Sequence, residues 1–219
     1  MMHGIPARDE PCGEFAERAS RVRSRLAHRA IILVGMMGAG KSSIGRRLAA
    51  GLDLPFNDAD SEIERAAGMS IEDMFREQGE TYFREGEERV IKRLLQAGPQ
   101  VMATGGGAIL SAATRAEIAK SGLSIWLNAP LDLLLQRVSR RDNRPLLKTG
   151  DPYAVLARLL ADRTPYYAGA DIVIESRDAP HDMIVAEILA VLDSYLDRAR
   201  YTESGTDREF TLSGNSPHS

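Results

Sequence analysis

The chain has 219 residues, 43% of them hydrophobic and 27% charged, which is typical of a globular protein long enough for one domain with a full core. A formal net charge of −3 gives no global electrostatic reason to expect a nucleic-acid or membrane partner. The single cysteine excludes an intrachain disulfide and a cysteine-based zinc site, and the longest apolar run, residues 30–39, is too short to cross a bilayer.

The two ends of the chain are polar. Residues 1–28 contain no apolar segment typical of a secretory signal, and their acidic residues argue against a transit peptide, so we expect a cytoplasmic protein. We expect residues 1–28 to form a partly helical extension, and neither residues 1–25 nor residues 202–219 to have a periodic apolar face strong enough to dock. From Tyr201 onward Ser, Thr, Gly and Asn dominate, which predicts a disordered tail over residues 201–219.

Between these ends, over residues 29–200, short apolar runs alternate with helical spacings. In chain order we expect a strand at 30–34, a helix at 42–52, a strand at 55–57, helices at 61–67, 70–78 and 82–96, a strand at 101–104, a helix at 111–120, a strand at 123–127, helices at 130–141 and 153–163, a strand at 172–174 and a helix at 180–198. This alternation predicts an α/β fold, a three-layer α/β/α sandwich with a five-stranded parallel sheet and helices on both faces. The stretch 60–96 is too long for a simple crossover, so we expect a substrate-binding insert there.

A glycine-rich motif directly follows the first strand. Residues 35–42 fit G-x-x-x-x-G-K-[ST], the pattern of a phosphate-binding loop between a strand and a helix. Its backbone N–H groups and the helix N-terminus can hold phosphates. Lys41, which we expect to face solvent, can reach the β- and γ-phosphates of ATP, and the Ser42 hydroxyl can ligate Mg²⁺.

The loop alone does not distinguish a kinase from a GTPase or a motor ATPase. The strand at 101–104 ends in glycine, without the aspartate that a motor ATPase usually places there. Residues 128–132 do not fit the Asn-Lys-x-Asp pattern of a guanine site. These two mismatches favour a small-molecule kinase.

Two further segments follow strand ends. Asp58 and Asp60 can divide the work between holding Mg²⁺ and accepting a hydrogen bond from an attacking hydroxyl, although a turn or helix cap would also use such residues. The run Gly105-Gly106-Gly107 suits close approach of a ligand to bare backbone, although a flexible turn would have the same composition.

Several blocks together resemble the shikimate kinase family, a group of P-loop, nucleoside-monophosphate-kinase-like small-molecule kinases. In order and approximate spacing the matching blocks are Gly35–Ser42, Asp58-Ala59-Asp60, Thr81–Glu87, Gly105–Ala108, Arg144–Leu147 and Arg163–Tyr167. The resemblance covers about residues 28–195 and leaves both ends of the chain outside it.

The resemblance implies ATP-dependent phosphorylation of the shikimate 3-hydroxyl, giving shikimate 3-phosphate and ADP, in aromatic amino-acid biosynthesis. It implies catalytic roles for Lys41, Asp60 and Arg144, with Arg144 in a lid at about 142–152. Shikimate would be bound by Asp60, Arg84, Gly105, Gly106, Gly107 and Arg163, and Mg²⁺ by Ser42 and Asp58. ATP would be bound by Gly38, Ala39, Gly40, Lys41, Ser42, Ser43, Arg144, one of Arg140 or Arg141, and the loop at Arg177. We expect a monomer whose partners are shikimate and ATP, without nucleic acid or membrane.

Two alternatives stay open from the sequence. A gluconate kinase shares the loop and the overall fold, but the glycine turn with Arg84 and the Arg-Pro-Leu-Leu block at 144–147 favour shikimate. A catalytically silent P-loop module would keep the fold without the chemistry, and intact Lys41, Ser42 and both aspartates argue against it.

Overall fold

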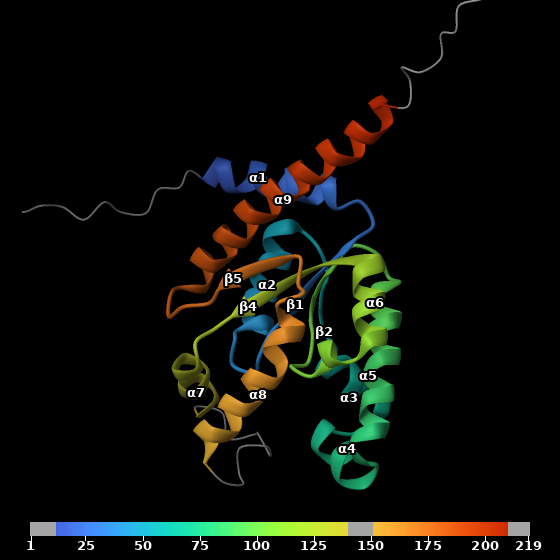
Figure 1. The fold of residues 1–219 in the computed structure, drawn as a ribbon, viewed down its shortest axis with the longest axis vertical. Coiled ribbons are helices and arrows are strands. Elements are labelled where there is room, and N and C mark those ends of the chain that lie inside the picture. Colours follow the sequence, from blue (N-terminus) through green and yellow to red (C-terminus); the bar gives the residue numbers. More distant parts are fainter. Residues whose placement is uncertain (1–11, 140–150, 210–219) are drawn as a thin grey trace, which may run out of the picture.

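The computed structural model describes residues 12–139 and 151–209, and its core is a five-stranded sheet (Figure 1). The strands are β1 (Ala30–Val34), β2 (Phe56–Asp58), β3 (Val101–Ala103), β4 (Gly122–Asn128) and β5 (Ile172–Glu175). All neighbouring pairs are parallel, in the order β2-β3-β1-β4-β5. The predicted parallel α/β sheet is therefore confirmed.

Strand composition follows position in the sheet. The central strand β1 has every residue buried, because it has a strand on each side and helices on both faces, and its sequence is accordingly apolar throughout. The edge strand β5 instead alternates, with Ile172 and Ile174 buried and Val173 and Glu175 exposed. Alternation of this kind is expected where one face of a strand is open to water.

The helices are α1 (Cys12–Leu26), α2 (Lys41–Leu52), α3 (Ala59–Ala67), α4 (Ile71–Glu77), α5 (Gly79–Leu95), α6 (Ala112–Ser121), α7 (Leu131–Ser139), α8 (Pro152–Tyr167) and α9 (His181–Glu209), with a 3₁₀ turn at Ala108–Leu110. Parallel crossovers are right-handed, so the connection from β1 to β2 places α2 on one face of the sheet. The connections from β2 to β3, from β3 to β4 and from β4 to β5 all run in the opposite direction, so they place α5, α6 and α8 on the other face. Helix α9 contacts both α2 and β5 and so completes the first face. Helices α3, α4 and α5 occupy the predicted insert.

The N-terminal helix α1 is docked, so the expectation that this segment has no face strong enough to dock is wrong. Ala19, Val22 and Leu26 are buried, with Val22 and Leu26 fully so, and they belong to the main core. Their spacing of three and four residues places them on one side of a helix. Figure 1 shows α1 lying across α9 at one end of the molecule.

Ion pairs tie α1 to both helices beneath it. The Arg25 guanidinium contacts Asp193 at 2.9 Å and Asp197 at 3.2 Å, both on α9. Arg21 also pairs with Asp193, and Arg23 pairs with Asp53, the residue that caps α2. The charged residues of α1 therefore lie on either side of its buried residues and fix the orientation of the helix. In the sequence alone, these charges suggest a solvent-exposed segment.

Parallel strands bring their carboxyl ends to one edge of the sheet, where ligands bind in open α/β folds. The glycine-rich loop follows β1, the two aspartates lie at the end of β2, and the glycine turn follows β3. The Thr104 backbone N–H and hydroxyl both donate to the Leu33 carbonyl at 3.2 Å, which fixes the end of β3 beside β1. The sheet order thus places the acceptor-side segments next to the phosphate loop.

The last helix is longer than expected. Helix α9 runs to Glu209, beyond residue 201, where we placed the start of a disordered tail.

Within residues 12–139 and 151–209, no helix combines the length and apolar character needed to span a membrane.

Candidate active site

The phosphate-binding loop wraps around its own lysine. Gly40 caps α2 with a φ of 98°, a left-handed conformation that an L side chain rarely adopts, and the next residue is Lys41. The Lys41 Nζ donates to the Gly35 carbonyl at 2.7 Å and to the Met36 carbonyl at 3.0 Å. With 9% of its surface exposed, Lys41 is buried, so the expectation that it faces solvent is wrong. Folding the ammonium back onto the loop gives it two carbonyl acceptors and keeps it beside the backbone that would hold phosphates.

The two predicted metal-binding residues are in contact. The Ser42 hydroxyl donates to Asp58 Oδ2 at 2.6 Å, which joins the first turn of α2 to the end of β2. A hydroxyl and a carboxylate are hard oxygen ligands, which Mg²⁺ prefers. Among the described residues no group of three or more His, Cys, Asp or Glu could hold a metal by itself. This pair therefore fits a Mg²⁺ that takes its remaining ligands from phosphate and water rather than a metal held by an all-protein cage.

On the acceptor side, two carboxylates meet at the glycine turn. A Cβ placed on Gly105 would lie 2.8 Å from both Asp60 Oδ1 and Glu87 Oε1, so these two oxygens lie within contact range of the same backbone position. Only a residue without a side chain fits there. Asp60 comes from the first turn of α3 and Glu87 from the middle of α5. The insert thus brings a second carboxylate to the predicted one.

The two predicted carboxylate-binding arginines also reach this turn. A Cβ on Gly107 would lie 2.7 Å from both terminal nitrogens of Arg84, and a Cβ on Gly106 would lie 3.2 Å from a terminal nitrogen of Arg163. Arg163 is buried, with 8% of its surface exposed. The structure therefore brings together Asp60, both arginines and the three glycines, although Asp60 and Arg163 are more than a hundred residues apart in the sequence.

Glu87 orients Arg84 and was missed by the sequence analysis. Arg84 donates to Glu87 Oε2 at 2.7 Å and to the exposed Glu80 at 3.2 Å, three and four residues away on the same helix face. Burial raises the pKa of the Glu87 carboxyl above its ordinary value, with Asp60 adding to the rise and Arg84 opposing it. The spacing Arg84-x-x-Glu87 was visible within one of the matched blocks, but it does not show that the glutamate points inward.

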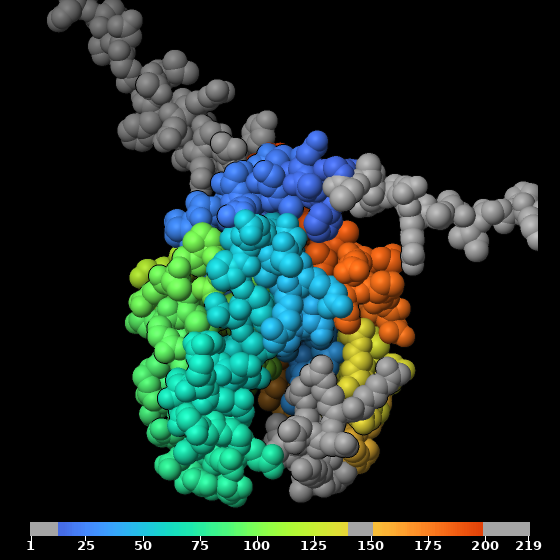
Figure 2. Space-filling model, turned by 180° about the vertical axis from the view of Figure 1, so that it is seen from behind, coloured from blue at the N-terminus to red at the C-terminus, as the bar shows by residue number. Residues whose placement is uncertain are grey.

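A cavity of about 450 Å³ lies at this edge of the sheet. Its lining comes from the phosphate loop, the end of β2, the glycine turn, α7 and the loop before α9: Met37, Gly38, Gly40, Lys41, Ser42, Ser43, Asp58, Asp60, Thr104, Gly106, Arg137, Val138, Asp178, Ala179 and His181. In Figure 2 the surface is hollowed below α2, beside the teal helices of the insert. Donor-side and acceptor-side residues thus line one continuous space.

The nucleotide end of the cavity differs in part from the expectation. Arg137, on α7, lines it and donates to the Arg177 carbonyl at 3.0 Å, whereas the Arg177 side chain pairs with Glu187 at 2.8 Å and is not in the lining. Arg140 and Arg144, both predicted to bind ATP, lie outside the described residues.

His181, the first residue of α9, also lines the cavity, and no sequence signal marked it. Burial lowers the pKa of its imidazole, and the nearby cations Arg47 and Arg137 lower it further. The lowered pKa favours the neutral form of this imidazole.

The fold and the loop define a P-loop protein of the α/β class, and comparisons with known proteins specify the family. A family model described as shikimate kinase matches residues 37–193. A shikimate kinase of Bradyrhizobium diazoefficiens is 56% identical over 175 residues, covering 80% of this chain and 84% of the relative, and one of Rhodopseudomonas palustris is 54% identical over 177 residues, covering 81% and 87%. The chain belongs to the shikimate kinase family.

Solved structures agree. The structure of the Acinetobacter baumannii shikimate kinase in complex with shikimate is similar with a TM-score of 0.75 at 38% identity, covering 79% of this chain and 97% of that one. A gluconokinase from Sinorhizobium meliloti is similar with a TM-score of 0.54 at 19% identity, covering 80% and 97%, which shows a shared fold alone.

Proposed function

We propose that this protein transfers the γ-phosphate of ATP to the 3-hydroxyl of shikimate, giving shikimate 3-phosphate and ADP. The observation that carries the proposal is that one cavity joins the phosphate loop to Asp60 and Gly106, and that Gly106 belongs to the glycine turn against which Arg84 and Arg163 lie. The first set suits a nucleoside triphosphate, and the second suits a small hydroxylated acid. The sequence relatives described above are named shikimate kinase, which supports shikimate as the acid.

In the proposed reaction, Arg84 and Arg163 hold the substrate carboxylate through charge-assisted forked hydrogen bonds. The reacting hydroxyl of the substrate lies against Asp60, which orients this hydroxyl. Asp60 accepts the hydroxyl proton while the hydroxyl oxygen forms a bond to the γ-phosphorus. The bond from that phosphorus to the β–γ bridging oxygen breaks, and ADP leaves. Lys41 moves from its carbonyl partners to the phosphate oxygens and stabilises their charge.

Mg²⁺ would be held by Ser42, with Asp58 supporting it, and would neutralise the charge of the β- and γ-phosphates when bound. The contact between these two residues supports this assignment. At the nucleotide end, Arg137 and His181 are the described side chains best placed to face the base or ribose. We expect the chain to work as a monomer on two small molecules.

A coupled assay of ADP release tests the proposal. The purified full chain is given MgATP alone, MgATP with shikimate, and MgATP with gluconate. We expect ADP release that depends on shikimate. Faster turnover of gluconate would support the gluconate kinase alternative instead. Nucleotide binding without turnover of either acid would identify a silent P-loop module and refute the proposal.

A further inference from the structure

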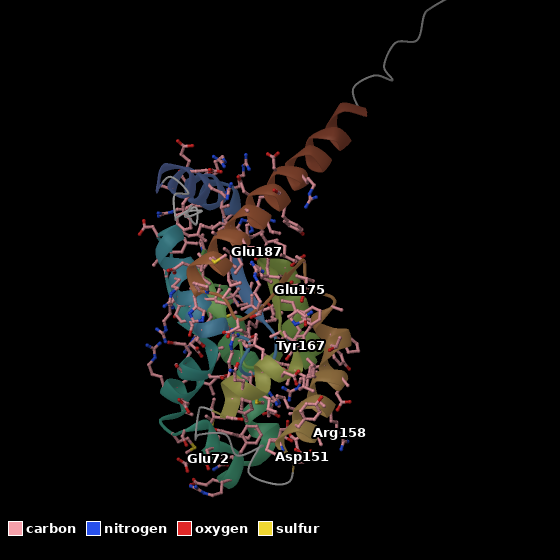
Figure 3. All side chains as sticks on the ribbon, turned by 90° about the vertical axis from the view of Figure 1, so that its left-hand side faces the viewer. Glu72, Asp151, Arg158, Tyr167, Glu175 and Glu187 are labelled. Carbon is pink, nitrogen blue, oxygen red and sulfur yellow. The ribbon has the colours of Figure 1, made fainter. Side chains whose placement is uncertain are left out.

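Tyr167, the last residue of α8, is buried between the donor and acceptor halves of the cavity wall. Its side chain is completely buried, and its hydroxyl donates to the Gly106 carbonyl at 2.6 Å. The same oxygen lies 3.6 Å from the Met36 sulfur in the phosphate loop. Figure 3 shows Tyr167 near the middle of the molecule, whereas Asp151 and Arg158, at and near the start of α8, lie at its outer end.

The ring of Tyr167 is held in place by packing. It stacks on Trp126 of β4, with ring centroids 5.8 Å apart and an interplanar angle of 24°. Trp126 in turn lies close to the start of the phosphate loop, since a Cβ on Gly35 would lie 3.3 Å from the Trp126 Cδ1 atom. Rigid aromatic packing of this kind fixes where the hydroxyl can donate.

The peptide that Tyr167 holds is the one between the two substrate arginines. Gly106 lies against Arg163, and Gly107 lies against Arg84. A trans peptide is planar, so its C=O and N–H point in opposite directions, and fixing the Gly106 carbonyl also fixes the N–H of Gly107. The same Cβ on Gly106 would also lie 3.6 Å from the Gly35 oxygen and the Met37 nitrogen, so Gly106 lies close to the phosphate loop as well as to Arg163.

We propose that Tyr167 is a positioning residue, which holds the Gly106–Gly107 peptide so that the acid-binding arginines keep their place relative to the phosphate loop. This inference rests on the proposed function and assigns to it a residue that does not touch the substrate. The phosphate loop has its own restraint in the Lys41 hydrogen bonds to Gly35 and Met36, so loss of the tyrosine hydroxyl should disturb the acceptor side more than the ATP side.

The hydroxyl can act as a donor over the whole working range of pH. Burial raises the pKa of Tyr167 to about 12, although the nearby Arg163 guanidinium opposes the rise. A phenol with such a pKa stays protonated at neutral and mildly alkaline pH. The effect of removing it should therefore be the same at pH 7 and pH 9.

Tyr167→Phe tests the proposal, because phenylalanine keeps the ring on Trp126 and removes only the hydroxyl. Tyr166→Phe is the matched control: the same change one residue earlier, in a side chain that is 40% exposed and lies under the Arg115 guanidinium. Full steady-state kinetics with shikimate and with ATP are measured for both variants and the wild type, together with the unfolding midpoint. Because KM does not depend on the fraction of molecules folded, partial unfolding cannot imitate the expected result.

We expect Tyr167→Phe to raise KM for shikimate roughly three- to thirtyfold, the effect of leaving one buried carbonyl without its donor. KM for ATP should stay within about twofold of the wild type, and Tyr166→Phe should resemble the wild type in every respect. A lower midpoint with both KM values unchanged would show that the hydroxyl only stabilises the fold, and an equal rise in both would show general disorder; either result overturns the proposal. A wild-type chain that does not phosphorylate shikimate would instead refute the proposed function.

Discussion

Replacing Arg84 by lysine should separate acid recognition from phosphate transfer. Arg84 reaches the glycine turn with both terminal nitrogens, and one of them is anchored by Glu87 at 2.7 Å. Lysine keeps the charge, but it offers a single ammonium instead of a planar fork, so it cannot bond to Glu87 and to a substrate carboxylate in the same geometry. Loss of one hydrogen bond to a charged group costs on the order of 1.5–3 kcal/mol. We therefore expect KM for shikimate to rise roughly ten- to hundredfold.

The assay is the same coupled measurement of ADP release, with each substrate varied in turn. Arg89→Lys is the matched control, because Arg89 is on the same helix, 66% of its side chain is exposed, and its contact with Glu85 is long, at 3.8 Å. The control should leave both KM values unchanged. If Arg84→Lys raised the KM values for shikimate and ATP equally, or left both unchanged, the assignment of Arg84 to the substrate carboxylate would be wrong, although the P-loop kinase assignment would survive.

Three further substitutions address the other parts of the molecule. Asp60→Asn should lower kcat by orders of magnitude while partly retaining shikimate binding by calorimetry; a change within about threefold, under ~1 kcal/mol, would leave Asp60 only a turn residue. Lys41→Ala should lower kcat by at least about a hundredfold with an unchanged circular dichroism spectrum, and turnover like that of the wild type would contradict the kinase mechanism. Leu26→Ala should lower the free energy of unfolding in urea by about 2–5 kcal/mol without changing kcat per folded molecule. Ser20 is exposed on the same helix, so Ser20→Ala should change neither the free energy of unfolding nor kcat. If Leu26→Ala lowered the free energy of unfolding no more than Ser20→Ala does, α1 would not be docked in solution.

Much of the candidate site could be predicted because its residues stand in local sequence patterns. A strand followed by glycines and Gly-Lys-Ser needs no knowledge of distant contacts, because the turn, the helix start and the phosphate-facing N–H groups all lie within one short segment. The apolar run of β1 and the alternation of strands with helices predicted a parallel sheet, and parallel strands place the residues after β2 and β3 at the same edge as that loop. The convergence of Asp60 and Gly105 on the phosphate loop follows from this arrangement.

Other features depend on which side chains meet across the fold, and periodicity shows only which residues share a face. The stripe of Ala19, Val22 and Leu26 is present in the sequence, but its burial depends on α9 passing beneath it, with Asp193 placed to pair with two of its arginines. Lys41 is buried because the loop curls its own carbonyls around the ammonium.

Arg137 and Tyr167 are ordinary residues in their local context, and each gains its role from a partner far along the chain. Glu87 pairs with Arg84 on its own helix, but its closeness to Gly105 and Asp60 depends on how that helix packs. Sequence alone thus determined the chemistry at the strand ends and the class of fold. The tertiary structure decided the order of the strands, the docking of α1 and the inward-facing residues, because burial and hydrogen bonding between distant segments are settled only when the chain has packed.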